Sequence, residues 1–182
     1  MADAQGKPLY SWRVLILPYL EEGNLYKSIH KDEAWDGPNN AKLTDSHLEA
    51  FGCPENRDST KPPPTSTNYL AVVGPHTAWT GAKPRKRSDF KDPSKTILVV
   101  QVVNSGIDWA EPRDLYIGQM PFAINPTAGQ GISSNRPGGA LVLFADAHVD
   151  FLENSTDPKK LAEMLDIDGP GPSNSAAEGA SR

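Results

Sequence analysis

The sequence contains a single cysteine, Cys53, among its 182 residues. One cysteine cannot close an internal disulfide and cannot supply a multi-cysteine metal site, so neither crosslink contributes to the stability of this chain. We expect Cys53 to be a small buried hydrophobe. Apolar residues are also scarce, at 37% of the chain, whereas there are 15 glycines and 17 prolines. This composition predicts one loop-rich domain with a modest core.

Long apolar runs are absent as well, since none approaches the roughly 20 residues that a membrane helix needs. The first six residues lack the basic start and the apolar run of a signal peptide. We expect Met1 to be a start codon added to the middle of a longer protein. Residues 170–182 are small and polar, which predicts a flexible tail. We therefore expect a lead-in at 1–10, one globular domain at 11–169 and the tail at 170–182.

An excess of positive charge is also missing. The chain holds 18 basic and 23 acidic residues, a net charge of −5, so the whole domain carries no general attraction for nucleic acid or an anionic membrane. The exception is the basic run at 83–87, continued by Lys91 and Lys95. Because prolines and the aspartates Asp89 and Asp92 are interleaved with it, we interpret this run as a solvated loop. Contact with a polyanion is the alternative.

The pattern of apolar residues predicts an α+β fold. Ser11 is expected to cap the first helix, Asn39 or Asn40 the third, and Ser155 or Asp157 the last. Pro18 should shorten the first helix. Helices precede strands at irregular spacing, which favours an antiparallel sheet with the helices on one face. The expected helices span 11–20, 24–29, 43–51 and 158–165, and the expected strands span 67–74, 96–103, 140–145 and 148–152.

Two of these strands stand out. The run at 96–103 is apolar without alternation, which indicates a central strand buried on both faces. The strands at 140–145 and 148–152 are separated only by Asp146 and Ala147, so we expect a tight antiparallel hairpin. Along the second strand of that hairpin, alternation places two side chains on one face and three on the other, as in a half-buried strand. The first set is Val149 and Phe151, and the second is His148, Asp150 and Leu152.

The sequence shows no motif of a known catalytic or phosphate-binding site. It has no Gly-x-Ser-x-Gly, no His-Glu-x-x-His and no glycine-rich loop between a strand and a helix, so we predict a protein that is not an enzyme. Asp146, His148 and Asp150 alternate at the hairpin and could form a nitrogen and oxygen site for a divalent ion. Solvent-facing polar residues on an edge hairpin explain the same pattern. We therefore expect no cofactor and keep calcium as the alternative.

Tryptophans in loops are the other candidate contacts. Trp35, Trp79 and Trp109 all lie in segments rich in turn residues. Such rings can form a platform for a carbohydrate or a peptide, and they can equally fill a small core.

Many short blocks resemble one protein family. The chain is similar to the planctomycete family called domain of unknown function 1559, also labelled solute-binding-like. The blocks occur in family order at consistent spacing, so the resemblance is specific. They span 6–20, 25–26, 32–36, 53–54, 67–75, 94–100, 109–115, 137–139 and 144–146.

The resemblance implies a pseudopilin-like protein. Family members begin with a prepilin-type leader and one long apolar helix, so this chain would be the globular body with that helix missing. The helix would anchor the protein in the inner membrane, and the body would face the periplasm or the cell surface. Its partners would be other pilin-like or secretion-system subunits, with no role for nucleic acid and with membrane contact only through the missing helix.

The family signature near the C-terminus is a histidine followed, after nine residues, by Asp-Gly. In this sequence the histidine position is Arg136, the aspartate is Asp146 and the glycine position is Ala147. A glycine at this position fits a turn that needs a positive φ. Alanine at 147 should therefore lower the free energy of unfolding by about 1 kcal/mol relative to glycine, or change the turn type. Arg136 cannot be a metal ligand, but it could pair with Asp146 or contact a ligand or partner.

Two hypotheses for the function follow from these observations. The first is a structural and interaction role for an extracytoplasmic pilin-like domain, in a type II secretion or type IV pilus-like assembly or in surface display. The alternative is a binding module for a small solute or a glycan, with the loop tryptophans at its site.

Overall fold

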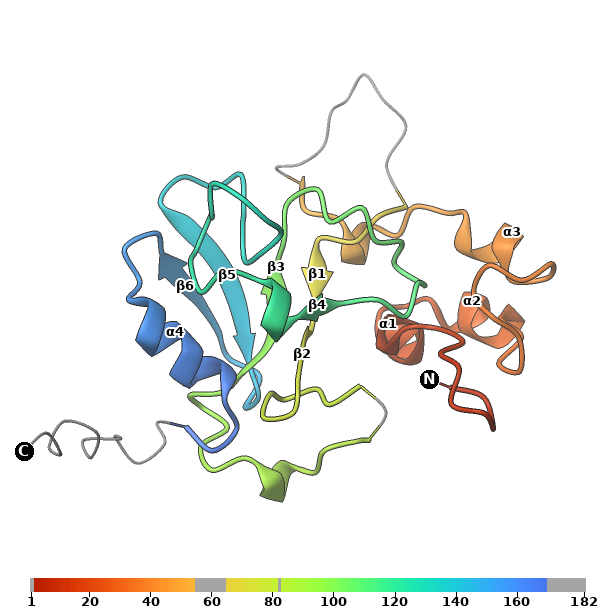
Figure 1. Ribbon diagram of the computed structural model, residues 1–182. Coiled ribbons are helices and arrows are strands. Elements are labelled where there is room, and N and C mark those ends of the chain that lie inside the picture. The colour runs from red at the N-terminus through yellow and green to blue at the C-terminus, as the bar shows by residue number, and fades with distance from the viewer. Residues whose placement is uncertain (1, 55–64, 82, 170–182) are drawn as a thin grey trace, which may run out of the picture.

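The computed structural model describes residues 2–54, 65–81 and 83–169 (Figure 1). The tail predicted at 170–182 lies outside the described residues. The main sheet has four strands in the order β1-β3-β5-β6, and every neighbouring pair is antiparallel. This arrangement confirms the α+β prediction and its antiparallel sheet. The strands are β1 (Tyr69–Leu70), β3 (Ile97–Gln101), β5 (Gly139–Phe144) and β6 (Val149–Glu153).

The central position of β3 confirms the prediction made from its uninterrupted apolar run. Its residues pair with β1 on one side and β5 on the other. Four of its five side chains are buried, and Leu98 is half-buried. The last of them, Gln101, donates a hydrogen bond from Nε2 to the sulfur of the buried Cys53 at 3.0 Å. Cys53 is therefore buried as expected, with a polar partner in the core.

The single strand predicted at 67–74 is wrong, because the chain changes sheet at Ala71. Residues before Ala71 form β1, and those after it form β2 (Val72–Val73), which pairs in parallel with β4 (Leu115–Tyr116). The backbone N–H of Ala71 donates to the carboxylate of Asp114 at 2.8 Å, and its carbonyl accepts from Leu115 at 3.1 Å. These bonds turn Ala71 away from β3 and toward β4.

The N-terminal helices form a unit with its own core. Ser11 caps α1 (Trp12–Ile16) through a hydrogen bond from the Arg13 N–H to its hydroxyl, as predicted. At Pro18 the chain continues as the 3-10 turn η1 (Leu17–Tyr19), followed by α2 (Gly23–Ser28). The buried members of this core are Leu9, Tyr10, Val14, Leu17, Ile29, Leu48, Phe51, Trp109 and Ala110.

The helix predicted at 43–51 is also wrong. The chain instead forms the one-turn helix α3 (Ala41–Thr44) and the 3-10 turn η2 (Glu49–Phe51). Asn40 does not cap α3 with its side chain, because Oδ1 already accepts the His30 N–H at 2.8 Å, while Nδ2 donates to the carbonyls of three residues in the preceding loop. The hydroxyl of Thr44 bonds the carbonyls of Asn40 and Ala41, which favours the end of the helix there.

The last helix, α4 (Pro158–Leu165), packs on the main sheet. Asp157 caps it by accepting from the N–H groups of Lys159 and Lys160, as predicted. Leu161 and Leu165 of α4 belong to the same buried cluster as the apolar side chains of β3 and β5. In Figure 1 the N-terminal helices lie at the other end of the molecule, so the helices are not gathered on one face as expected. None of the described helices is long and apolar enough to cross a membrane.

The hairpin of β5 and β6 confirms the prediction for 140–152. Phe144 donates its N–H to the carbonyl of His148 and accepts at its carbonyl from Ala147, both at 2.9 Å. This is a three-residue loop whose last residue is left-handed, and Ala147 indeed has a φ of 77°. On β6, Leu152 is buried, Phe151 is half-buried and Val149 is 59% exposed.

Replacement of Ala147 by glycine is expected to raise the free energy of unfolding by about 1 kcal/mol, because glycine adopts a positive φ without steric cost. Urea unfolding measures the change. The matched control is Ala145→Gly in the same turn, where φ is not positive. At position 145 the substitution should lower the free energy of unfolding by roughly 0.5–1 kcal/mol. Glycine relieves no strain there and only increases the conformational entropy of the unfolded chain. Equal losses in the two variants would contradict the prediction.

Candidate functional site

Two of the three residues proposed for a metal site meet at the hairpin turn. His148 Nδ1 lies 2.6 Å from Asp146 Oδ1, and the His148 ring stacks on Phe144 with centroids 4.4 Å apart. Two hydrogen bonds lower the pKa of Asp146. The larger effect comes from the backbone N–H of His148 and the smaller one from the His148 ring. Asp150 instead accepts the N–H of Phe151 at 2.8 Å. Among the described residues, no group of three or more His, Cys, Asp or Glu side chains is placed so that it could hold a metal ion.

The signature positions do not form one site. Arg136 precedes β5, whereas Asp146 and Ala147 follow it. A strand of six residues spans roughly 20 Å, which is beyond the reach of an arginine side chain. Of the contacts considered for Arg136, the pairing with Asp146 is therefore out of reach.

The three loop tryptophans have different surroundings. Trp109 is 1% exposed, stacks on Phe51 and donates from Nε1 to the carbonyl of Ser46 at 2.9 Å, so its ring belongs to the core. Trp79 is half-buried, packs against Trp12 with centroids 5.3 Å apart and donates to the carbonyl of Leu98 at 2.7 Å. Trp35 lines a surface hollow.

That hollow, here called the Trp35 hollow, has a volume of about 270 Å³. Three carboxylates border it, from Asp36, Asp45 and Asp108. Burial raises the pKa of Asp108 above its ordinary value, and the negative charges of Glu111 and Asp45 act in the same direction. The hollow therefore combines an aromatic wall with acidic groups. Its lining residues are Trp35, Asp36, Ala41, Thr44, Asp45 and Asp108.

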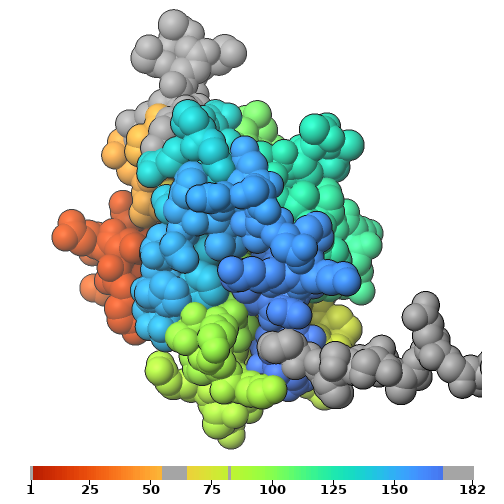
Figure 2. Space-filling view, turned by 90° about the vertical axis from the view of Figure 1, so that its left-hand side faces the viewer, coloured from red at the N-terminus to blue at the C-terminus, as the bar shows by residue number. Residues whose placement is uncertain are grey.

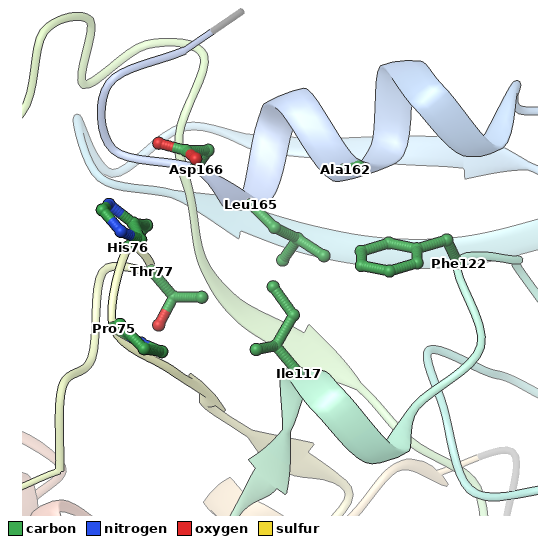
Figure 3. Close-up of a pocket in the computed structure, with 8 residues that line it drawn as sticks. All are labelled: Pro75, His76, Thr77, Ile117, Phe122, Ala162, Leu165 and Asp166. Atoms are coloured by element: carbon green, nitrogen blue, oxygen red, sulfur yellow. The ribbon is translucent and has the colours of Figure 1, made fainter. Parts of the chain in front are cut away.

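A second hollow, here called the α4 groove, lies beside the last helix (Figure 3). It has a volume of about 240 Å³. Figure 3 shows Ile117, Phe122 and Leu165 directed toward a common space, with His76 and Asp166 at one end. Its lining residues are Pro75, His76, Thr77, Ile117, Phe122, Ala162, Leu165 and Asp166.

Backbone contacts position the walls of the α4 groove. The N–H of Ile167 donates to the carbonyl of His76 at 2.9 Å, which ties the end of α4 to the turn after β2. Gly74 allows Ile117 to approach this turn, since a Cβ on Gly74 would lie 2.5 Å from the Ile117 side chain. Phe122, which lines the groove, is 36% exposed, and Tyr116, the residue before Ile117 in the chain, is 50% exposed. The groove could therefore accommodate apolar side chains of another molecule.

The comparisons with known proteins gave one match. The model of the family described as "Protein of unknown function (DUF1559)" matches residues 1–97, which is more than half of the chain. The chain belongs to the DUF1559 family. No curated protein and no solved structure matches it. The DUF1559 match covers α1 to β2 and the basic run, while β5, β6 and α4 follow it, so the α4 groove takes its lining from both parts.

A buried ion pair that was not predicted from the sequence joins these two parts. Arg13, within the DUF1559 match, donates from Nη1 to Asp114 Oδ1 at 2.9 Å and from Nη2 to the Arg113 carbonyl at 3.0 Å. The Arg13 side chain is fully buried and that of Asp114 is 9% exposed. Burial raises the pKa of Asp114, and Arg13 opposes that shift. The one feature of the sequence that could have indicated this pair is the presence of an arginine within the apolar run that follows Ser11.

Proposed function

We propose that this chain is a non-enzymatic interaction domain that docks other proteins through the α4 groove. The observation that carries the proposal is the largely apolar lining of this groove, which includes the exposed aromatic side chain of Phe122. Exposed aromatic rings around an apolar hollow are typical of protein–protein interfaces. A hollow of about 240 Å³ has room for one or two apolar side chains of a partner.

The context of this interaction is a pilin-like assembly outside the cytoplasm. In this proposal an N-terminal apolar helix anchors the full-length protein in the inner membrane, and the body meets other pilin-like or secretion-system subunits in the periplasm or at the cell surface. The proposal rests on the blocks at 6–20 and 67–75 and on the prepilin-type leader of the proteins that they resemble. A leader of Gly-Phe-Thr-Leu-Ile-Glu type in the gene upstream of codon 1 would support it, and a soluble domain encoded there would contradict it.

A photo-crosslinking experiment tests the groove. A benzoyl-phenylalanine residue replaces Phe122 in the full-length protein, which is irradiated in its native cells, and crosslinked partners are identified by mass spectrometry. We expect a discrete adduct with a subunit that carries a prepilin-type leader. The matched control places the same residue at Tyr19, which is 84% exposed and lies in the N-terminal unit. The same adducts from both positions, or none from position 122, would overturn the proposal.

A second candidate function is the binding of a glycan or a small solute in the Trp35 hollow. The observation that favours it is a tryptophan wall beside three carboxylates, since sugars stack on aromatic rings and donate hydrogen bonds to carboxylates. A thermal-shift screen with sugars and divalent ions at millimolar concentration tests it. A rise in melting temperature that Trp35→Ala abolishes would support this candidate.

A further inference from the structure

The basic run forms a folded, protruding lobe. Residues 83–95, here called the basic lobe, hold six lysines and arginines against two aspartates, a net charge of +4 in a chain of net charge −5. The remainder of the molecule therefore carries a net charge of −9. In Figure 1 the 3-10 turn η4 (Arg87–Asp89) is the lowest point of the molecule, and Figure 2 shows the same segment projecting at the lower edge.

Hydrogen bonds hold the lobe in shape. The guanidinium of Arg85 donates to the carbonyl of Thr77 at 3.2 Å and to that of Pro75 at 2.6 Å, so this residue departs from the interpretation of the run as a solvated loop. The N–H of Lys86 donates to Asp89 at 2.8 Å, and the N–H of Lys91 donates to the carbonyl of Ile167 at 2.9 Å. The backbone is therefore fixed at several points along the lobe.

Most of the cations of the lobe remain available. Lys95 pairs with Asp92 at 3.2 Å, and Arg85 is used as described. The other four side chains are exposed and form no hydrogen bond or ion pair with any part of the chain that the structure describes. They are Lys83, Lys86, Arg87 and Lys91.

We infer that the basic lobe docks the domain, tip first, on an anionic lipid surface. Cations near such a surface are attracted within about a Debye length, roughly 8 Å at physiological ionic strength. A protruding tip can bring its cations to a flat surface while the acidic remainder stays farther away. A long flexible polyanion would also meet the acidic flanks, so the distribution of charge favours the flat surface. This contact is separate from any N-terminal anchor and from the α4 groove.

Vesicle cosedimentation tests the inference with the chain of 182 residues. Wild type should bind phosphatidylcholine vesicles that contain roughly one-third phosphatidylglycerol, should not bind pure phosphatidylcholine, and should be released by high salt. The double variant Lys86→Gln/Arg87→Gln should bind roughly 30-fold more weakly, at about fivefold for each cation near the surface.

The matched control is Lys159→Gln/Lys160→Gln, which removes the same charge from exposed positions at the start of α4. It should bind like the wild type, and circular dichroism should show both variants folded. Equal losses in the two double variants would mean that only net charge matters and would overturn the inference. Binding to soluble heparin without binding to anionic vesicles would assign the lobe to a polyanionic chain and would also overturn it.

Discussion

Replacement of Arg13 by methionine is expected to lower the free energy of unfolding by about 3–5 kcal/mol. The side chain of Arg13 is fully buried, and its partner Asp114 also accepts the Ala71 N–H and the Trp12 Nε1–H at 3.3 Å. Methionine fills much of the volume of arginine but leaves the Asp114 carboxyl buried without its cation. The carbonyl of Arg113 would also lose its donor. Urea unfolding at neutral pH measures the loss.

The neighbouring Arg113 provides a matched control. It forms an ion pair with Glu111 at 2.6 Å, but its side chain is more than half exposed. Arg113→Met should therefore cost about 1 kcal/mol or less. A loss in Arg13→Met no larger than that in Arg113→Met would show that the buried pair contributes nothing specific. The double variant Arg13→Met/Asp114→Asn should recover part of the loss, because asparagine removes the buried negative charge and keeps a carbonyl oxygen for Ala71.

Replacement of Gly139 by alanine is expected to destabilise the hairpin of β5 and β6. A Cβ on Gly139 would lie 2.0 Å from the carbonyl oxygen of Leu152 and 2.9 Å from the Phe151 ring. The first contact is with backbone, so β6 would have to move away from β5 where Gly139 pairs with Glu153. We expect a loss of about 3 kcal/mol or more in urea unfolding, at the upper end of the cost of overpacking.

The control for this substitution is Gly23→Ala. Gly23 begins α2, and no atom lies within 4 Å of the Cβ that alanine would add. Alanine favours the helix more than glycine, so this variant should be unchanged or up to about 1 kcal/mol more stable. A Gly139→Ala protein as stable as the wild type would mean that β5 and β6 can separate there without cost.

Local pattern was sufficient for the elements that depend on nearby residues. The apolar run of β3 indicated a central strand, and Asp157 before Pro158 indicated the start of α4. The wrong predictions involve hydrogen bonds between side chains and backbone groups, either distant in the sequence or within a helical turn. The strand at 67–74 divides because Ala71 bonds the carboxylate of Asp114, 43 residues later, and the helix at 43–51 fails at Thr44. Periodicity does not encode such bonds.

The candidate site was harder to predict for a related reason. The α4 groove takes residues from the turn after β2, from the segment after β4 and from α4. Its apolar members, such as Ile117 and Phe122, are unremarkable residues in their own segments. The loop tryptophans were conspicuous in the sequence, but the ring of Trp109 fills the core. Only the packing of distant segments distinguishes a groove wall from a core side chain.

The bond between Asp150 and Phe151 also affects how this domain behaves at high concentration. The bonds from Phe144 to His148 and from Asn154 to Gly138 direct the even-numbered residues of β6 toward β5, so the Phe151 N–H points outward from the sheet edge. An exposed edge strand is a template for pairing with a strand of another molecule. The carboxylate of Asp150 occupies that donor and adds a negative charge beside it. Asp150 thereby opposes edge-to-edge aggregation of the folded domain.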